Sequence, residues 1–97
     1  MKTMTDVSEM TPNQLVSWFM IASYAYYRLG GDHQVMDDQT FDYLVERLKE
    51  NYDLAEHIHK KHITKENLEA GTGFDIKYPN MVIGAYRSYM REYNENR

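Results

Sequence analysis

The stretch that decides the fold reads Ser23-Tyr-Ala-Tyr-Tyr-Arg-Leu29, Gly30-Gly31-Asp32-His33-Gln34 and Val35-Met-Asp-Asp-Gln-Thr-Phe-Asp-Tyr-Leu-Val-Glu-Arg-Leu48. The glycine pair favours a left-handed turn that ends a helix. Apolar residues recur at three- and four-residue steps on both sides of it, as they do on one face of a helix. We therefore predict two helices packed as a hairpin. The two apolar stripes are Leu15, Trp18, Phe19, Ala22, Tyr26 and Leu29 before the glycines and Phe41, Leu44, Val45 and Leu48 after them.

Start signals define the two helices of the hairpin. Thr11-Pro12-Asn13-Gln14 supplies a capping hydroxyl, a proline at the first helical position and a glutamine three residues after the cap. The first helix is therefore predicted over 12–29. Asp37 or Asp38 can cap the second helix, because a carboxylate is favourable at the positive end of the helix dipole. This helix is predicted over 38–51.

Two further helices complete an all-α prediction. Asp53-Leu-Ala-Glu56 repeats the cap-and-box pattern and opens a shorter helix over 53–62. Asn80 can cap a last helix over 80–94. No segment sustains the alternation that is typical of a strand. We expect one small domain of about four helices over 1–97, with residues 1–10 fraying at the N-terminus.

Length and composition set limits on the class of protein. Ninety-seven residues suffice for one modest core. The absence of cysteine excludes a disulfide framework and thiolate chemistry. Apolar runs stay below the roughly 18 residues that a membrane span needs, and residues 1–10 lack the layout of a secretion signal. We expect a cytoplasmic protein that does not bind a membrane.

Acidic residues are concentrated around the second predicted helix. Between Asp32 and Glu56 there are eight carboxylates and two basic residues, in a chain of net charge −4. Such a surface repels phosphate backbones, so we expect no direct binding to nucleic acid. It is either a solvated face that keeps the protein soluble or a docking surface for a protein with a basic patch. The residues predicted to bind that partner are Asp37, Asp38, Asp42, Glu46 and Glu50.

Three tyrosines lie close together near the end of the first predicted helix. Tyr24, Tyr26 and Tyr27 cannot all face one core, so at least one of them should be exposed. Tyr26 shares the apolar stripe and is expected in the core. Tyr24 and Tyr27 lie at its margins, where a ring either packs with its hydroxyl at the surface or contacts a ligand or partner.

Residues 23–48 resemble the short helical domain Ia at the N-terminus of NAD-dependent DNA ligases. The likeness consists of an aromatic-rich helix end, a loop, and an Asp-x-x-aromatic-Asp-x-Leu-x-x-x-Leu pattern that here begins at Asp38 and ends at Leu48. In that family the domain closes over the nicotinamide mononucleotide half of NAD. Tyr27 stands where the family commonly has His, and Phe41 where it commonly has Tyr. The resemblance implies a site for nicotinamide mononucleotide or NAD made by Tyr24, Tyr26, Tyr27, Asp38, Phe41 and Asp42.

No catalytic motif accompanies this likeness. The Lys-x-Asp-Gly motif of the ligase nucleotidyltransferase core is absent, as are a phosphate-binding loop and a nucleophile elbow. Asp38 and Asp42 share a helix face, but nothing in the sequence shows that they form an acid/base pair. We therefore expect no enzyme activity from the chain alone and no resident cofactor.

Three hypotheses of function remain, and the first two belong to different classes. The first is an interaction or regulatory protein, of the kind a compact viral or mobile-element genome encodes, that binds a host or replication protein. The alternative is a nucleotide-binding module that recognises nicotinamide mononucleotide or NAD in a crevice between helices. A weaker third hypothesis is a subunit that completes a split enzyme. Seven methionines and a tyrosine-rich last helix could also bury a face between copies of the chain.

Three histidines near the end of the third predicted helix are candidate metal ligands. His57 and His59 would lie on opposite sides of a helix, and only His59 and His62 would share a face. The sequence defines no third ligand. We expect incidental surface histidines and no metal centre.

Overall fold

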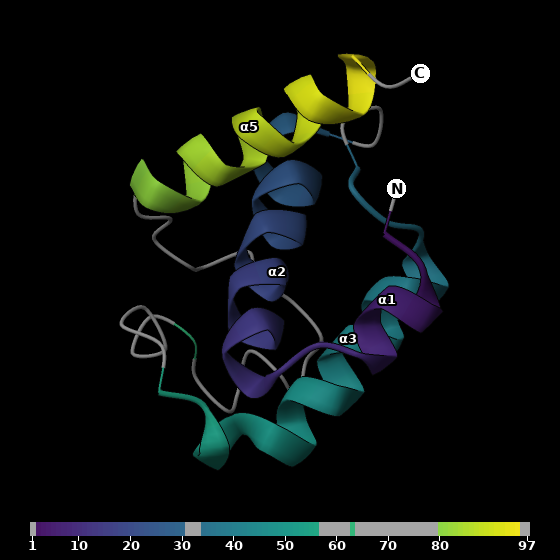
Figure 1. Cartoon of the computed structure of the whole chain (residues 1–97), viewed down its shortest axis with the longest axis vertical. Coiled ribbons are helices and arrows are strands. Elements are labelled where there is room, and N and C mark those ends of the chain that lie inside the picture. Colours follow the sequence, from purple (N-terminus) through teal and green to yellow (C-terminus); the bar gives the residue numbers. More distant parts are fainter. Residues whose placement is uncertain (1, 31–33, 57–62, 64–79, 96–97) are drawn as a thin grey trace.

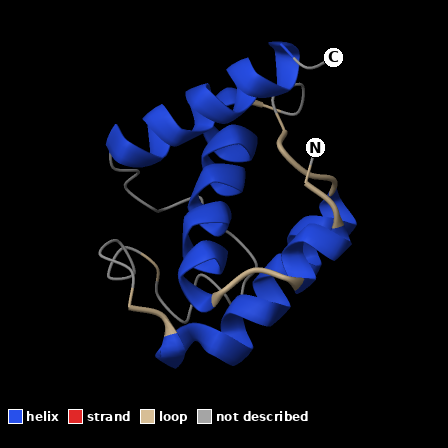
Figure 2. Ribbon diagram, in the orientation of Figure 1, coloured by secondary structure: helices blue, strands red, loops and turns tan. Residues whose placement is uncertain are grey.

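The computed structural model describes residues 2–30, 34–56, 63 and 80–95, and this part is built from helices without a strand (Figure 1 and Figure 2). The predicted all-α class is confirmed. Two irregular helical turns extend the regular helices, since a π-helical turn, η1, follows α2 and a 3-10 turn, η3, follows α3. The elements are α1 (Met4–Ser8), α2 (Pro12–Tyr24), η1 (Ala25–Leu29), α3 (Asp38–Asn51), η3 (Tyr52–Leu54) and α5 (Asn80–Glu95).

Helix α2 is the centre of the arrangement. It packs against α3 and against α5, while α1 packs against α3 (Figure 1). The predicted pairing of the first two long helices is therefore present. Phe19, Leu44 and Leu48 are fully buried where α2 meets α3, and Val82 and Tyr86 are buried on α5. Trp18 and Phe41, which we expected in the core, are partly buried and pack against it.

The capping residues explain where the two central helices begin. The Thr11 hydroxyl accepts a hydrogen bond from the Gln14 amide at 3.2 Å, and the Gln14 side chain accepts one from the Thr11 amide at 2.9 Å. This is the predicted capping box. At α3 the Asp37 carboxylate accepts a hydrogen bond from the Thr40 amide at 2.8 Å. Asp37 is therefore the cap, and Asp38 is the first helical residue.

The C-terminal end of the first predicted helix differs from the prediction. A π-helical turn contains an extra residue, because its hydrogen bonds join residues five apart rather than four. The three- and four-residue spacing then no longer keeps every apolar side chain on the core face. Tyr26 is 48% exposed and Leu29 is 38% exposed, so the expectation that Tyr26 lies in the core was wrong. Gly30 ends the turn with a φ of 95°, as the glycine pair suggested.

The N-terminal segment is also more structured than predicted. Residues 1–10 were expected to fray, but five of them form α1, which begins with a capping box between Thr3 and Asp6. Val7 on this helix is fully buried. The Lys2 amide donates a hydrogen bond to the Val35 carbonyl at 2.8 Å. A buried side chain and a backbone bond to a distant segment hold the N-terminus in place.

The predicted helix over 53–62 is not α-helical in its described beginning. Residues 52–54 form the 3-10 turn η3, and Ala55 is extended with a ψ of 136°. The Glu56 amide donates to the Asn13 side chain at 2.7 Å instead of closing a helical turn. Residues 57–62 lie outside the described part.

The last predicted helix, over 80–94, agrees with α5 to within one residue. Its 16 residues make it the longest of the described helices. Within the described ranges, no helix combines the length and apolarity that crossing a bilayer requires.

Truncating the buried contact between α2 and α3 should destabilise the fold. Leu44→Ala removes a fully buried side chain and leaves a cavity, which costs about 2–5 kcal/mol of unfolding free energy. Leu54→Ala is the matched control, because Leu54 is 68% exposed. Urea unfolding followed by circular dichroism would measure both. Equal midpoints for Leu44→Ala and the unmodified chain would contradict this placement.

Candidate functional site

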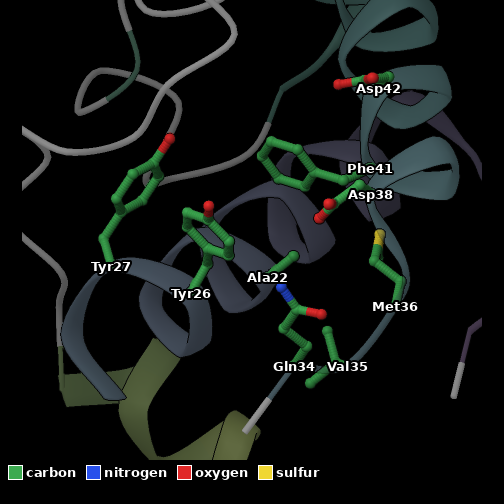
Figure 3. Close-up of a pocket in the computed structure, with 9 residues that line it drawn as sticks. All are labelled: Ala22, Tyr26, Tyr27, Gln34, Val35, Met36, Asp38, Phe41 and Asp42. Atoms are coloured by element: carbon green, nitrogen blue, oxygen red, sulfur yellow. The ribbon is translucent and has the colours of Figure 1, made fainter. Parts of the chain in front are cut away.

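A pocket of about 290 Å³ lies between the α2–η1 end and the start of α3 (Figure 3). Three segments supply its walls, namely the end of the first long helix, the connecting residues before α3, and the first turn of α3. We refer to it as the inter-helix pocket. Its lining consists of Ala22, Tyr26, Tyr27, Gln34, Val35, Met36, Asp38, Phe41 and Asp42.

The apolar part of the inter-helix pocket is held by the core. Ala22, Val35 and Met36 are each at most 5% exposed, so their positions are set by packing. The Phe41 ring stacks on the buried Phe19 ring, with centroids 5.8 Å apart and an interplanar angle of 18°. Phe41 is therefore a supported wall of the pocket and not a mobile surface ring.

Two tyrosines from the π-helical turn add aromatic surface. The Tyr26 and Tyr27 rings meet edge to face with centroids 4.8 Å apart and an interplanar angle of 82°. Both residues line the pocket (Figure 3). π-Helical turns within helices occur frequently at functional sites. Here the turn accompanies the exposure of Tyr26, which an uninterrupted apolar stripe would have buried.

Two carboxylates lie on the α3 side of the pocket. Asp38 and Asp42 are four residues apart and therefore lie on one face of the helix, and both are exposed. Neither is ion-paired with another residue in the described part of the chain. The described lining contains no Lys, Arg or His. The chemistry of the pocket, aromatic faces beside carboxylates, suits a cation and disfavours a phosphate.

Five of the six residues predicted to bind a nucleotide meet in this pocket, and Tyr24 does not. Its ring packs against Tyr86 of α5, with centroids 5.6 Å apart and an interplanar angle of 70°. Burial raises the pKa of Tyr86. Tyr24 therefore joins α2 to α5 as a packing residue and lies outside the lining shared by the other five.

The sequence did not predict the wall made by residues 34–36. Val35 is held by the backbone bond from Lys2, whose side chain reaches in another direction. The Lys2 ammonium lies 4.7 Å from the centroid of the Trp18 ring and 5.7 Å from that of Tyr89. No local pattern links a residue at position 2 to these rings, so only the folded chain reveals the contact.

The predicted partner-binding carboxylates lie mainly along α3. Asp38, Asp42, Glu46 and Glu50 are spaced by four residues and all are exposed; we call them the acidic stripe. Glu46 forms an ion pair with Lys49 at 3.6 Å, which offsets part of its charge. Asp37 is exposed but serves as the helix cap. The stripe begins at the inter-helix pocket, since Asp38 and Asp42 belong to both.

Metal binding finds no support in the described residues. Among them, no group of three or more His, Asp and Glu side chains is placed to hold an ion. His57, His59 and His62 lie outside the described ranges.

In comparisons with known proteins, the chain matches no family model, no curated protein and no solved structure. Function is therefore inferred from the chemistry of the inter-helix pocket and the acidic stripe.

Acidification should weaken the start of α3. Hydrogen bonds from the Thr40 side chain and amide lower the pKa of Asp37 below its ordinary value of 3.8. A depressed carboxyl pKa contributes stability that is present above the unfolded value and is lost as the pH falls through the folded one. Asp37→Asn keeps an acceptor without a titrating charge, so its melting temperature should fall less between about pH 5 and about pH 2.

The control for this experiment is Glu50→Gln, which removes an exposed carboxylate of the same helix outside the cap. Its melting temperature should follow that of the unmodified chain across the acid range. Parallel curves for Asp37→Asn and the unmodified chain would show that the cap does not contribute to acid sensitivity.

Proposed function

We propose that this chain is a non-catalytic binding module that docks on a protein with a basic surface. The observation that supports this best is the continuity of the acidic stripe with an aromatic pocket. Four exposed carboxylates follow one side of α3, and the first two line the same pocket as the Tyr26, Tyr27 and Phe41 rings (Figure 3). The combination offers a partner both a long-range charge and a place to insert a side chain.

The two parts of this surface contribute in different ways. An exposed ion pair contributes about 0–1 kcal/mol, so the stripe adds little affinity per carboxylate. A cluster of one sign nevertheless raises the rate of association with an oppositely charged surface. Affinity in protein interfaces comes mainly from a few side chains inserted into packed pockets. The stripe would therefore steer the partner, and the pocket would hold it.

The class of partner follows from charge and from the resemblance to a ligase accessory domain. A basic face on a replication or host protein complements the stripe and accords with a regulatory role. A second copy of this chain is less suited to this face, because two acidic stripes would repel each other.

Reversing charge on the stripe should slow association without unfolding the protein. Glu46→Lys and Glu50→Lys together change the stripe at exposed positions, where a substitution shifts stability by about 0.5 kcal/mol or less. The partner is first captured from the host by pull-down and identified by mass spectrometry. Its association rate constant is then measured by biolayer interferometry. We expect a fall of at least about tenfold at low salt, and a smaller one at high salt.

The matched control carries the same change in net charge at another place. Glu9→Lys with Glu92→Lys alters two exposed carboxylates of the N-terminal segment and α5. This variant should associate at a rate within about threefold of the unmodified chain, since steering depends on where the charge lies. Equal slowing by both double variants would mean that net charge alone matters, and the proposal would then fail.

A second candidate function is recognition of nicotinamide mononucleotide or NAD. It is favoured by the convergence of Tyr26, Tyr27, Asp38, Phe41 and Asp42 on one pocket, because the ligase resemblance implies these residues. The nicotinamide ring of oxidised NAD is flat and positively charged, which suits aromatic faces and carboxylates. A volume of about 290 Å³ is just below the roughly 300–1,000 Å³ of small-molecule sites. It would accept the nicotinamide end rather than a whole dinucleotide.

Nicotinamide mononucleotide would then shift backbone amide resonances around the pocket. We expect shifts at Tyr26, Tyr27 and 38–42 in a two-dimensional NMR titration. The shift at Tyr24 should be smaller, because Tyr24 packs on α5. Binding should be weak, since an open pocket must order the ligand without enclosing it. Spectra that stay unchanged at millimolar ligand would reject this candidate.

A further inference from the structure

We infer that the inter-helix pocket receives an arginine side chain from the basic surface of the partner. This inference rests on the proposed function and names the group that enters the site. It starts from three features of the pocket, namely its aromatic faces, its two carboxylates and the lack of any basic residue in its described lining.

The shape of the guanidinium group matches these features better than an ammonium group does. A guanidinium is planar, so one face can stack on an aromatic ring while its edge donates parallel hydrogen bonds to a carboxylate. Phe41 offers a ring that is braced by Phe19, and Asp38 and Asp42 lie one helical turn apart beside it (Figure 3). A lysine ammonium is a compact, strongly hydrated charge that makes no paired contact of this kind.

The chain itself shows that a cation settles on aromatic rings next to carboxylates. A second hollow, near the N-terminus, is lined by Asp6, Glu9 and Trp18. The Lys2 ammonium lies 4.7 Å from the centre of the Trp18 ring there. In this hollow the chain itself supplies the cation, which is the Lys2 ammonium. The inter-helix pocket also combines aromatic rings with carboxylates, but none of the described residues that line it is basic.

Size and openness also favour a side chain. The apolar lining residues Ala22, Val35 and Met36 are nearly fully buried. The methylene stem of an arginine can pack on them while the guanidinium stays near the rim. The carboxylates are exposed and the cavity measures about 290 Å³. A single long side chain can enter such a space without a requirement for closure.

The experiment is an NMR titration of the full chain, labelled with nitrogen-15, with three blocked tripeptides. The central residue is arginine, lysine or citrulline, and citrulline keeps the shape of arginine without its charge. We expect the arginine peptide to shift the amide resonances of Tyr26, Tyr27, Phe41 and Asp42 with a dissociation constant in the millimolar range, since one side chain makes the contact. The lysine peptide should bind several-fold more weakly, and citrulline should produce no saturable shift.

Two double variants separate the pocket from the rest of the acidic stripe. Asp38→Asn with Asp42→Asn keeps the shape of the rim but removes its charge. This variant should bind the arginine peptide about three- to thirtyfold more weakly. Glu46→Gln with Glu50→Gln removes the same charge further along α3 and should change binding by less than about twofold, because exposed charges are screened with distance. Tyr26→Leu, at a half-exposed ring, tests the aromatic contribution independently and should weaken the arginine peptide severalfold.

Several results would overturn the inference. The pocket does not recognise a guanidinium if the arginine and lysine peptides bind with equal affinity, or if the citrulline peptide produces saturable shifts. The same conclusion follows if the two double variants lose equal affinity for the arginine peptide. A different result would reject the proposed function without rejecting this inference. If the arginine peptide binds as expected but reversal of Glu46 and Glu50 leaves association with the captured protein unchanged, the pocket is retained and docking through the stripe is rejected.

Discussion

The packing of α3 on α2 is the contact on which the pocket and the acidic surface both depend. Phe19, Leu44 and Leu48 are fully buried where the two helices meet, and Phe41 stacks on Phe19 at the edge of that contact. Burying one such side chain contributes about 1.5–3 kcal/mol, whereas an exposed ion pair contributes about 0–1 kcal/mol. Apolar packing therefore sets the rotation of α3. Helical periodicity then turns the acidic stripe toward solvent.

Two less regular features complete the inter-helix pocket. The π-helical turn η1 accompanies the placement of Tyr26 and Tyr27 at one wall. The N-terminal segment supports the opposite wall, because the backbone of Lys2 bonds to Val35 while its ammonium lies over Trp18. The residues that line the cavity of about 290 Å³ all fall between Ala22 and Asp42. The bond from Lys2 is therefore the contact by which a distant part of the chain supports the pocket.

The electrostatics of the described lining favour a cation over an anion. A helix start can bind an anion through its free amides, but at α3 the Thr40 amide already donates to Asp37. The described lining offers two carboxylates and no basic group. A cation is the ligand that this arrangement stabilises. A basic side chain and the nicotinamide ring of oxidised NAD share that property, so the two candidate functions are chemically related although they belong to different classes.

The sequence by itself determined the helical class, the bounds of α3, the start of α2 and the extent of α5, because caps and apolar periodicity act over a few neighbouring residues. The resemblance to the ligase accessory domain also indicated five of the pocket residues, together with Tyr24, which does not line the pocket. Tertiary structure alone decided the rest. Tyr24 packs on Tyr86 and Val7 holds the N-terminus, since both outcomes depend on contacts between residues far apart in the chain. Tyr26 leaves the core at the π-helical turn. Local propensity contains no information about such contacts. The apolar spacing likewise did not predict the π-helical turn, which shifts the register of the side chains that follow it.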